Sequence, residues 1–288
     1  MLHVMIDSER PEDKLHETAV PTITIVTPSL NQGRYIEKTI KSVLAQQYPR
    51  LQYILVDGGS VDGTMEIVRR YAEHFAWWVS EPDSGQANAI NKGFRRSSGE
   101  IMGWLNSDDQ LAPDALQAIS EIFRKEPDTY AVVGHVDIID QDGLFKLRLP
   151  GHYSTRARLV AFWRGYTMHQ PSIFWRRDVW ERVGELDESL HLSMDFDFWL
   201  RVSRFYSFRN VDLVLSRATL HPDAKTSDGF VSYRRAQRRD LLRHFCVPRR
   251  ISDVPITTLI YGHYLKAMAR RLFAKVARKH SASTTGRS

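Results

Sequence analysis

The sequence predicts an α/β protein whose sheet is mixed, parallel at its start and antiparallel later. Apolar, β-branched runs at residues 22–27 and 52–57 alternate with segments of helical periodicity, and turn residues follow each run. Strand, helix, strand, helix is the order of a βαβ unit, whose strands are parallel. A hairpin signal between Gln141 and Gly143 then separates strands expected at 130–140 and 144–149, which would be antiparallel.

Helical periodicity and turn residues predict the other elements. Apolar residues recur at helical spacing from Tyr35 to Leu44, and Pro49 ends that pattern. Pro113 opens a further helix, because its fixed φ suits a first helical position. The remaining expected elements are helices at 64–72, 86–96, 113–125 and 178–183, a short strand at 77–80, and a largely buried helix that begins near residue 194.

The strongest chemical signal is the apolar run of residues 100–109, which ends in Asn106, Ser107, Asp108 and Asp109. We expect a buried strand that delivers these side chains to its own C-terminal end. Ligands of open α/β sheets bind outside the carboxyl ends of the strands, and carboxylate oxygens suit a hard divalent cation that carries a phosphorylated substrate. The alternative is a plain Asn/Asp turn that leads into the next helix.

Asp57 ends the second expected strand and is followed by Gly58 and Gly59. The spacing G-x-G-x-x-G is absent, which excludes a dinucleotide-binding fingerprint. A carboxylate at this position could accept hydrogen bonds from a nucleobase or ribose, or it could close its own loop as an Asx turn. The loop before the 86–96 helix, together with the N-terminus of that helix, could hold a phosphate.

The helix that begins near residue 194 carries two acids at its start, Asp195 and Asp197. The helix dipole alone favours an acid there. Side chains two residues apart on a helix do not face each other, so the two acids need not share a role. We keep the structural explanation for Asp197 and treat Asp195 as a candidate functional group.

Length and composition fit one large α/β domain with an appendage. The chain has 288 residues, of which 42% are hydrophobic and 26% charged, as is ordinary for a globular protein. No run of about 18 apolar residues offers a membrane span, and the charged first 20 residues lack the apolar core of a signal peptide. A single cysteine, Cys246, excludes an internal disulfide framework, so we expect a cytoplasmic protein.

The net charge of +6 conceals a basic C-terminal segment. Residues 231–288 hold 14 Lys and Arg against 2 acids, so the first 230 residues carry about −6. The body has no zinc-finger spacing, aromatic RNA-binding motif or basic stripe, and nucleic acid is therefore not an expected partner. From 256 to 280, apolar residues fall on one helical face and Lys and Arg on the other, which is typical of a helix at a membrane surface. The alternative is a terminal helix that packs on the rest of the protein.

Eight segments in register between residues 20 and 230 resemble the inverting nucleotide-sugar glycosyltransferases of family 2. The segments are TPSLN at 27–31, SVLAQ at 42–46, VDGGSVDGT at 56–64, DSGQ at 83–86, AINKG at 89–93, NSDD at 106–109, HQ at 169–170 and MDFDFWLR at 194–201. The resemblance implies a GT-A fold, a Rossmann-like mixed sheet flanked by helices, here with a C-terminal helical extension.

The same resemblance divides the chain. Residues 1–20 would be an N-terminal extension, and 21–230 the catalytic domain, with a nucleotide-binding half at 21–110 and an acceptor half at 111–230. Residues 231–280 would form the basic helical extension and 281–288 a disordered tail.

Site residues follow from the resemblance position by position. Asn106-Ser-Asp108 resembles the family's D-x-D metal motif with Asn in place of the first Asp, which leaves Asp108 as the implied ligand of Mn²⁺ or Mg²⁺ and weakens the motif. His221 would close over the metal diphosphate, and Asp195 would be the general base. The resemblance implies donor contacts from Thr27, Pro28, Ser29, Asn31, Asp57, Asp83, Gln86, Asn91, Asn106, Ser107 and Lys225, and acceptor contacts from His169, Gln170 and Trp199.

The implied reaction is a single displacement. Metal charge would neutralise the diphosphate leaving group while Asp195 takes a proton from an acceptor hydroxyl, and the anomeric configuration would invert. The Q-x-x-R-W motif of processive members is absent, which favours single additions. We expect a glycan or lipid-linked acceptor in cell-surface polysaccharide or glycolipid synthesis, with the enzyme held at the inner face of the plasma membrane through residues 256–280.

Two other functions compete with this one. A nucleotidyltransferase of related fold usually has a Gly-rich, basic phosphate loop after its first strand, and residues 27–31 are not such a loop. A non-catalytic scaffold or sugar-binding protein would not need both Asp108 and Asp195.

Overall fold

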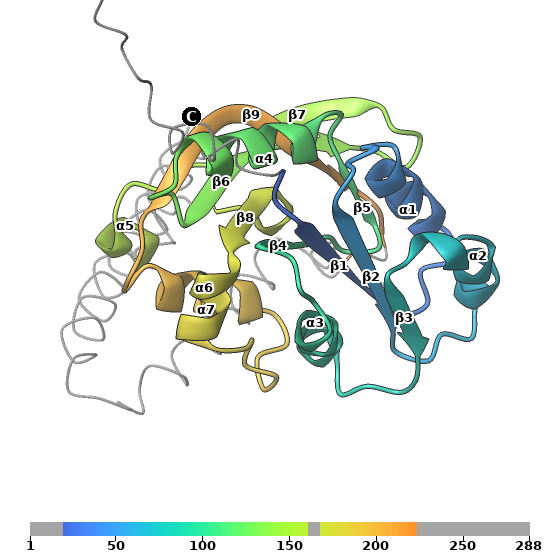
Figure 1. The fold of residues 1–288 in the computed structure, drawn as a ribbon. Helices are drawn as coiled ribbons and strands as arrows, with labels where there is room; N and C mark the ends of the chain where they lie inside the picture. Colours follow the sequence, from blue (N-terminus) through green and yellow to red (C-terminus); the bar gives the residue numbers. More distant parts are fainter. Residues whose placement is uncertain (1–19, 161–167, 223, 225–288) are drawn as a thin grey trace, which may run out of the picture.

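The structure, a computed structural model, describes residues 20–160, 168–222 and 224. Within these residues, helices cover both faces of a curved mixed sheet (Figure 1). None of the helices in the described part is long and apolar enough to cross a membrane. The expectations for residues 1–19, for Lys225, for the basic helix at 256–280 and for the tail at 281–288 fall outside the described residues.

Four parallel strands form the half of the sheet that carries the candidate site. In spatial order they are β3 (Trp77–Ser80), β2 (Leu51–Asp57), β1 (Ile23–Ser29) and β4 (Ile101–Trp104). β1 is buried along its whole length, as expected for a parallel strand flanked by helices on both sides. Ser29 pairs with Asp57, and Asp57 with Ser80, so the carboxyl ends of three strands lie side by side. The parallel start predicted from the sequence is confirmed.

Alternate residues of the strands face two separate hydrophobic cores. On β1, Val26 belongs to the core shared with helices α3 (Gln86–Arg95), α6 (Arg177–Val183) and α7 (Met194–Val202). Ile25 belongs to the opposite core, with α1 (Ile36–Leu44), α2 (Thr64–Arg70) and α4 (Ala115–Lys125). This alternation follows from the period of two in a strand.

The second half of the sheet is largely antiparallel. β8 (Ile173–Arg176) runs antiparallel to β4 and to β6 (Ala131–Ile139), and β7 (Phe145–Leu149) pairs with β6 as the predicted hairpin. β9 (Phe208–Thr219) lies parallel to β6 and antiparallel to β5 (Asp109–Leu111). Short helical segments complete the described part: η2 (Ala72–His74), α5 (Arg156–Val160) and η4 (Gln170–Ser172).

The expected strand at 100–109 is divided in two. β4 ends at Trp104, the chain turns through Asn106, whose carbonyl accepts from Asp109 N at 3.0 Å, and the chain resumes as β5. The helix expected to open at Pro113 begins at Ala115 instead, because Asp114 adopts a left-handed conformation with φ of 58°.

Candidate active site

Asp108 and His221 meet although 113 residues separate them. β5 begins at Asp109 and runs antiparallel to β9, where Asp109 pairs with Ala218. The residue before β5 therefore comes close to the residues that follow β9. His221 Nε2 lies 3.1 Å from Asp108 Oδ2. The structure thus brings together the two residues predicted to hold the metal diphosphate.

The His221 side chain is packed in this position. Its side chain is buried, and its ring lies against Tyr35, with 4.1 Å between ring centroids. The second ring nitrogen, Nδ1, is buried and has no hydrogen-bond partner among the described residues. Asp108 retains 22% side-chain exposure, so its side chain is partly accessible.

Asn106 and Asp109 complete the turn around Asp108. Gln86 Nε2 donates to Asn106 Oδ1 at 2.7 Å, and Asn106 Nδ2 lies 3.3 Å from Asp109 Oδ2. Burial raises the pKa of Asp109 well above its usual range, and the charge of Asp108 adds to the rise. Asp109 is enclosed and biased towards its neutral form, which leaves Asp108 as the carboxylate suited to a cation.

The donor set at Asp108 fits a hard divalent cation that shares its coordination with a substrate. The described residues contain no group of three or more His, Cys, Asp or Glu side chains that could enclose an ion. Mg²⁺ is commonly held by one or two carboxylates together with substrate phosphates and water. Asp108 and His221 fit such an arrangement, because the rest of the coordination would come from the diphosphate.

The ends of β1 and β2 form a second group of polar side chains. Asp57 Oδ2 accepts hydrogen bonds from Gly59 N at 3.1 Å, Ser60 N at 2.8 Å and Ser80 Oγ at 2.7 Å. The Asp57 carboxylate therefore closes its own loop, as the Asx-turn alternative requires. Ser29 Oγ, next to it in the sheet, is buried, and none of the described residues forms a hydrogen bond with it.

Asn31 and Asp83 belong to the loops that border this group. Asn31 has a left-handed backbone with φ of 52°, and its Oδ1 accepts from Val61 N at 3.0 Å, which joins the loop after β1 to the loop after β2. Asp83 Oδ2 lies 2.8 Å from the position that a Cβ on Gly58 would occupy, and Asp83 Oδ1 accepts from Gly85 N at 2.8 Å. A Cβ at position 58 would require the Asp83 carboxylate to move.

Asp195 is the second residue of α7 and is half-buried. Burial raises its pKa to about 6, against hydrogen bonds from the backbone N–H groups of Phe196 and of Asp195 itself. One turn further along the same helical face, Trp199 stacks on Trp104, with 5.5 Å between ring centroids and 7° between ring planes. Trp104 is the last residue of β4, so α7 packs on the strand that leads to Asp108.

Residues 24–184 match the model of Glycosyl transferase family 2, more than half of the chain. The chain belongs to glycosyl transferase family 2. An uncharacterised glycosyltransferase of Mycobacterium tuberculosis is 32% identical over 189 residues, which cover 65% of this chain and 70% of the relative. Chondroitin synthase of Escherichia coli is 28% identical over 205 residues, 70% of this chain but 29% of that longer protein.

Solved structures confirm the fold of this family 2 glycosyltransferase. A mannosyltransferase from Pyrobaculum calidifontis, in complex with GDP-Man and Mn²⁺, superposes with a TM-score of 0.63 at 21% identity and covers 94% of this chain and 77% of its own. Residues 1–349 of S. aureus TarS, in complex with UDP, give 0.59 at 16% identity, over 83% of this chain and 69% of that chain. The fold is GT-A, as the sequence resemblance implied.

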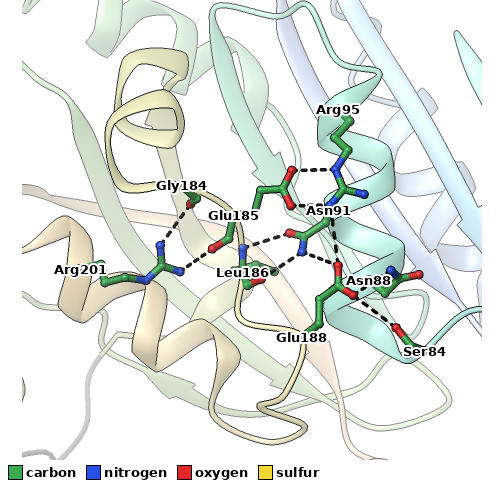
Figure 2. A network of polar contacts seen from close by, with 9 residues as sticks. All are labelled: Ser84, Asn88, Asn91, Arg95, Gly184, Glu185, Leu186, Glu188 and Arg201. Atoms are coloured by element: carbon green, nitrogen blue, oxygen red, sulfur yellow. Dashed lines mark hydrogen bonds and ion pairs between the residues drawn. The ribbon is translucent and has the colours of Figure 1, made fainter. Parts of the chain in front are cut away.

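Several predicted contact residues of the glycosyltransferase are enclosed by protein. Thr27 Oγ1 lies 3.2 Å from Tyr53 Oη in the core, and Trp199 is fully buried in its stack on Trp104. Asn91 is also fully buried, and both of its amide hydrogens go to protein oxygens, on Leu186 and Glu188 (Figure 2). The expected ligand contacts of the Trp199 and Asn91 side chains are replaced by supporting roles, because neither side chain reaches a surface.

Other predicted residues lie near the end of β4. Gln170, in η4, donates to the Trp104 carbonyl at 2.7 Å, and its buried Oε1 has no hydrogen-bond partner within the part of the chain that the structure describes. His169 is half-buried directly before it. Ser107 is buried in the turn after β4, and Pro28 lies within β1. Lys225 falls outside the described residues.

Some residues that build the site gave no signal in the sequence. Ser80, which supports Asp57, ends a short half-exposed strand, and Tyr35, which lies against His221, reads as the ordinary start of a helix. Glu188 has hydrogen-bond partners on α3, about 100 positions earlier in the chain. Contacts of this range depend on the fold, and the residue types alone do not reveal them.

Proposed function

We propose that this glycosyltransferase moves a sugar from a nucleotide-diphosphate donor to an acceptor hydroxyl with inversion at the anomeric carbon. One observation carries the proposal: the segments that hold the two candidate carboxylates both connect to the end of β4. Asp108 lies in the turn after β4, and α7, which begins at Met194 and carries Asp195, places Trp199 in a stack on the last residue of β4. A leaving-group site and a base placed around one point are what a single displacement needs.

The donor would lie across the carboxyl ends of β1, β2 and β4. Relatives support a nucleotide-diphosphate donor, since TarS structures hold UDP and UDP-GlcNAc and the mannosyltransferase holds GDP-Man. Ser29, Asn31 and Asp57 would face the nucleoside, with Asp57 acting through the loop that it closes. The loop at Asp83 and the side chains of Gln86 and Asn106 would border the diphosphate.

A divalent cation, Mn²⁺ or Mg²⁺, would be held by Asp108 and His221 together with the diphosphate. When bound, it would supply positive charge that stabilises the diphosphate as a leaving group. The Mn²⁺ of the mannosyltransferase complex supports this cofactor. His221 Nε2, 3.1 Å from Asp108 Oδ2, on a ring that packs against Tyr35, gives Asp108 a preformed partner.

Asp195 would take the proton from the attacking hydroxyl. As the oxygen–carbon bond forms at the anomeric carbon, the bond from that carbon to the diphosphate oxygen breaks, and the nucleoside diphosphate leaves with the electron pair. Its half-buried position keeps the pKa of Asp195 near 6, so the carboxylate is ionised yet basic at neutral pH. His169 and Gln170, beside the end of β4, would contact the acceptor.

The acceptor would be a growing cell-surface glycan or a lipid-linked precursor. Relatives that support polysaccharide synthesis include chondroitin synthase and a putative teichuronic acid biosynthesis glycosyltransferase of Bacillus subtilis. The basic segment at 256–280 would hold the enzyme at the cytoplasmic face of the membrane, because each Lys or Arg near an anionic surface gains about 1 kcal/mol.

Replacement of Asp108 tests the proposed donor site. Binding of UDP or GDP, whichever the wild type binds, is measured by calorimetry with Mn²⁺ present. Asp108→Ala should weaken this binding by more than about tenfold, because mutation of residues that only hydrogen-bond to a metal ligand already costs about that much. Binding of the matching nucleoside should change little, because it does not contact the metal. Asp142→Ala, in the exposed turn between β6 and β7, is the matched control. An equal loss for diphosphate and nucleoside would mean that the fold, and not a metal site, was damaged.

A further inference from the structure

The end of α6 and the segment 184–188 that follows it form hydrogen bonds with both α3 and α7 (Figure 2). On the α3 side, Asn91 pairs with the backbone of Leu186 in both directions: its Oδ1 accepts from Leu186 N, and its Nδ2 donates to Leu186 O, both at 3.0 Å. On the α7 side, Arg201 donates to Val183 O at 2.6 Å and to Glu185 O at 2.7 Å. Arg201 is itself oriented by Asp197 at 2.9 Å.

Glu188 links this segment to the start of α3. Its carboxylate accepts from Asn88 Nδ2 at 2.9 Å, Asn91 Nδ2 at 3.0 Å and Ser84 Oγ at 3.3 Å. Arg95 lies 3.9 Å away. These donors hold the pKa of Glu188 below its usual range, with the Asn91 hydrogen bond contributing most, so the group is a carboxylate at neutral pH. Hydrogen bonds to a charged acceptor are the stronger kind.

The linked parts lead to two different parts of the proposed site. Ser84 lies between Asp83 and Gly85 in the donor loop before α3, whereas the chain after Glu188 leads within a few residues to Asp195. His191, on this connection, has its Nδ1 3.9 Å from the position that a Cβ on Gly85 would occupy. The connection therefore runs along the donor loop before α7 begins.

We propose that Glu188 is a positioning residue that fixes the 184–193 segment to the donor loop and thereby sets the place of Asp195 relative to the donor. The inference rests on the proposed function, in which Asp195 is the base. Glu188 does not touch the reacting atoms. Its effect would come through geometry, because a displacement of about 1 Å in a reacting group can cost about 100-fold in rate.

Glu185 offers a matched control for Glu188. It lies on the same segment and forms an ion pair with the same arginine, Arg95, but on the exposed surface and without contacts to Ser84, Asn88 or Asn91. Exposed ion pairs contribute little to stability. Glu185→Ala therefore removes one surface charge alone, whereas Glu188→Ala also removes the hydrogen bonds to Ser84, Asn88 and Asn91.

The first readout is kinetic. Release of nucleoside diphosphate is measured for the full chain with Mn²⁺ and UDP-GlcNAc or GDP-mannose, whichever the wild type turns over, and Kd for UDP or GDP is measured in parallel. Glu188→Ala should lower kcat by about 10- to 100-fold, with Kd within about twofold of wild type. Glu188→Gln keeps one acceptor oxygen, so its kcat should lie between those of the wild type and Glu188→Ala. Glu185→Ala should behave as wild type.

The second readout does not require turnover. Amide hydrogen exchange over residues 186–197 should be faster in Glu188→Ala than in wild type and unchanged in Glu185→Ala. Wild-type kcat in a folded Glu188→Ala protein, or equal losses in both Ala variants, would overturn the positioning role. A wild type that turns over no nucleotide sugar would instead contradict the proposed function, and the exchange measurement would still decide whether Glu188 anchors the segment.

Discussion

At the scale of single residues, Asp195 shows how position sets chemistry. An aspartate with its usual pKa of about 4 would be a weak base, whereas burial at the start of α7 raises the pKa to about 6. Asp197, two residues later, is enclosed and paired with Arg201 at 2.9 Å, which secures the segment before α7. The sequence analysis expected a structural role for Asp197, and its contact with Arg201 agrees with that. The role of Asp195 as the base stays a prediction.

The Asp108 turn shows what residue types alone can indicate. A strand that ends in Asn106, Ser107 and Asp108 predicted a polar turn at the carboxyl edge of the sheet, and the structure has that turn. The contact with His221 was expected only by resemblance, because it requires β5 and β9 to pair. Nothing in the sequence near either residue encodes that pairing.

At the scale of elements, β1, β2, β3 and the β6–β7 hairpin were predictable from the sequence, whereas β5, β8 and β9 were not. β1, β2 and β3 are runs bounded by turn residues, which periodicity detects. β9 was missed because its pairing with β6 shifts register at His135 and Val136, so apolar residues do not alternate regularly along it. β5 has three residues, too few to show a period, and β8, with four residues, was not among the expected strands.

The packing of α3 on β1 gives a prediction at this scale. A Cβ on Gly93 would lie 2.5 Å from Val26 Cγ1, so Gly93→Ala must push α3 away from β1. We expect the free energy of unfolding, measured in urea, to fall by about 1–3 kcal/mol, the usual cost of overpacking a core. Lys92→Ala, on the same turn, removes a largely surface ion pair with Glu81 and should cost less than about 1 kcal/mol. Equal urea midpoints of unfolding for the wild type and Gly93→Ala would show that α3 and β1 are not tightly packed.

At the scale of the whole molecule, the charge distribution bears on location. The basic segment at 256–280 lies outside the described residues, so its membrane role rests on its sequence pattern. Full-length protein should float with vesicles that contain anionic lipid at low salt and detach at high salt, because screening shortens the reach of the attraction. Glutamine in place of Lys266, Arg270, Arg271 and Arg278 should abolish flotation. Flotation of that variant at wild-type levels would mean that another surface binds the membrane.

The central claim, that Asp195 is the base of a single displacement, is tested most directly by the pH dependence of kcat in wild type and in Asp195→Asn. A general base acts when deprotonated, so wild-type kcat should rise with pH through about 6 and level off above it. Asp195→Asn should bind the donor nucleotide as wild type does, lose about 10²- to 10⁴-fold in kcat, and lack that rise. Near-normal turnover in Asp195→Asn, with the same rise near pH 6, would contradict the account and assign the base to another group.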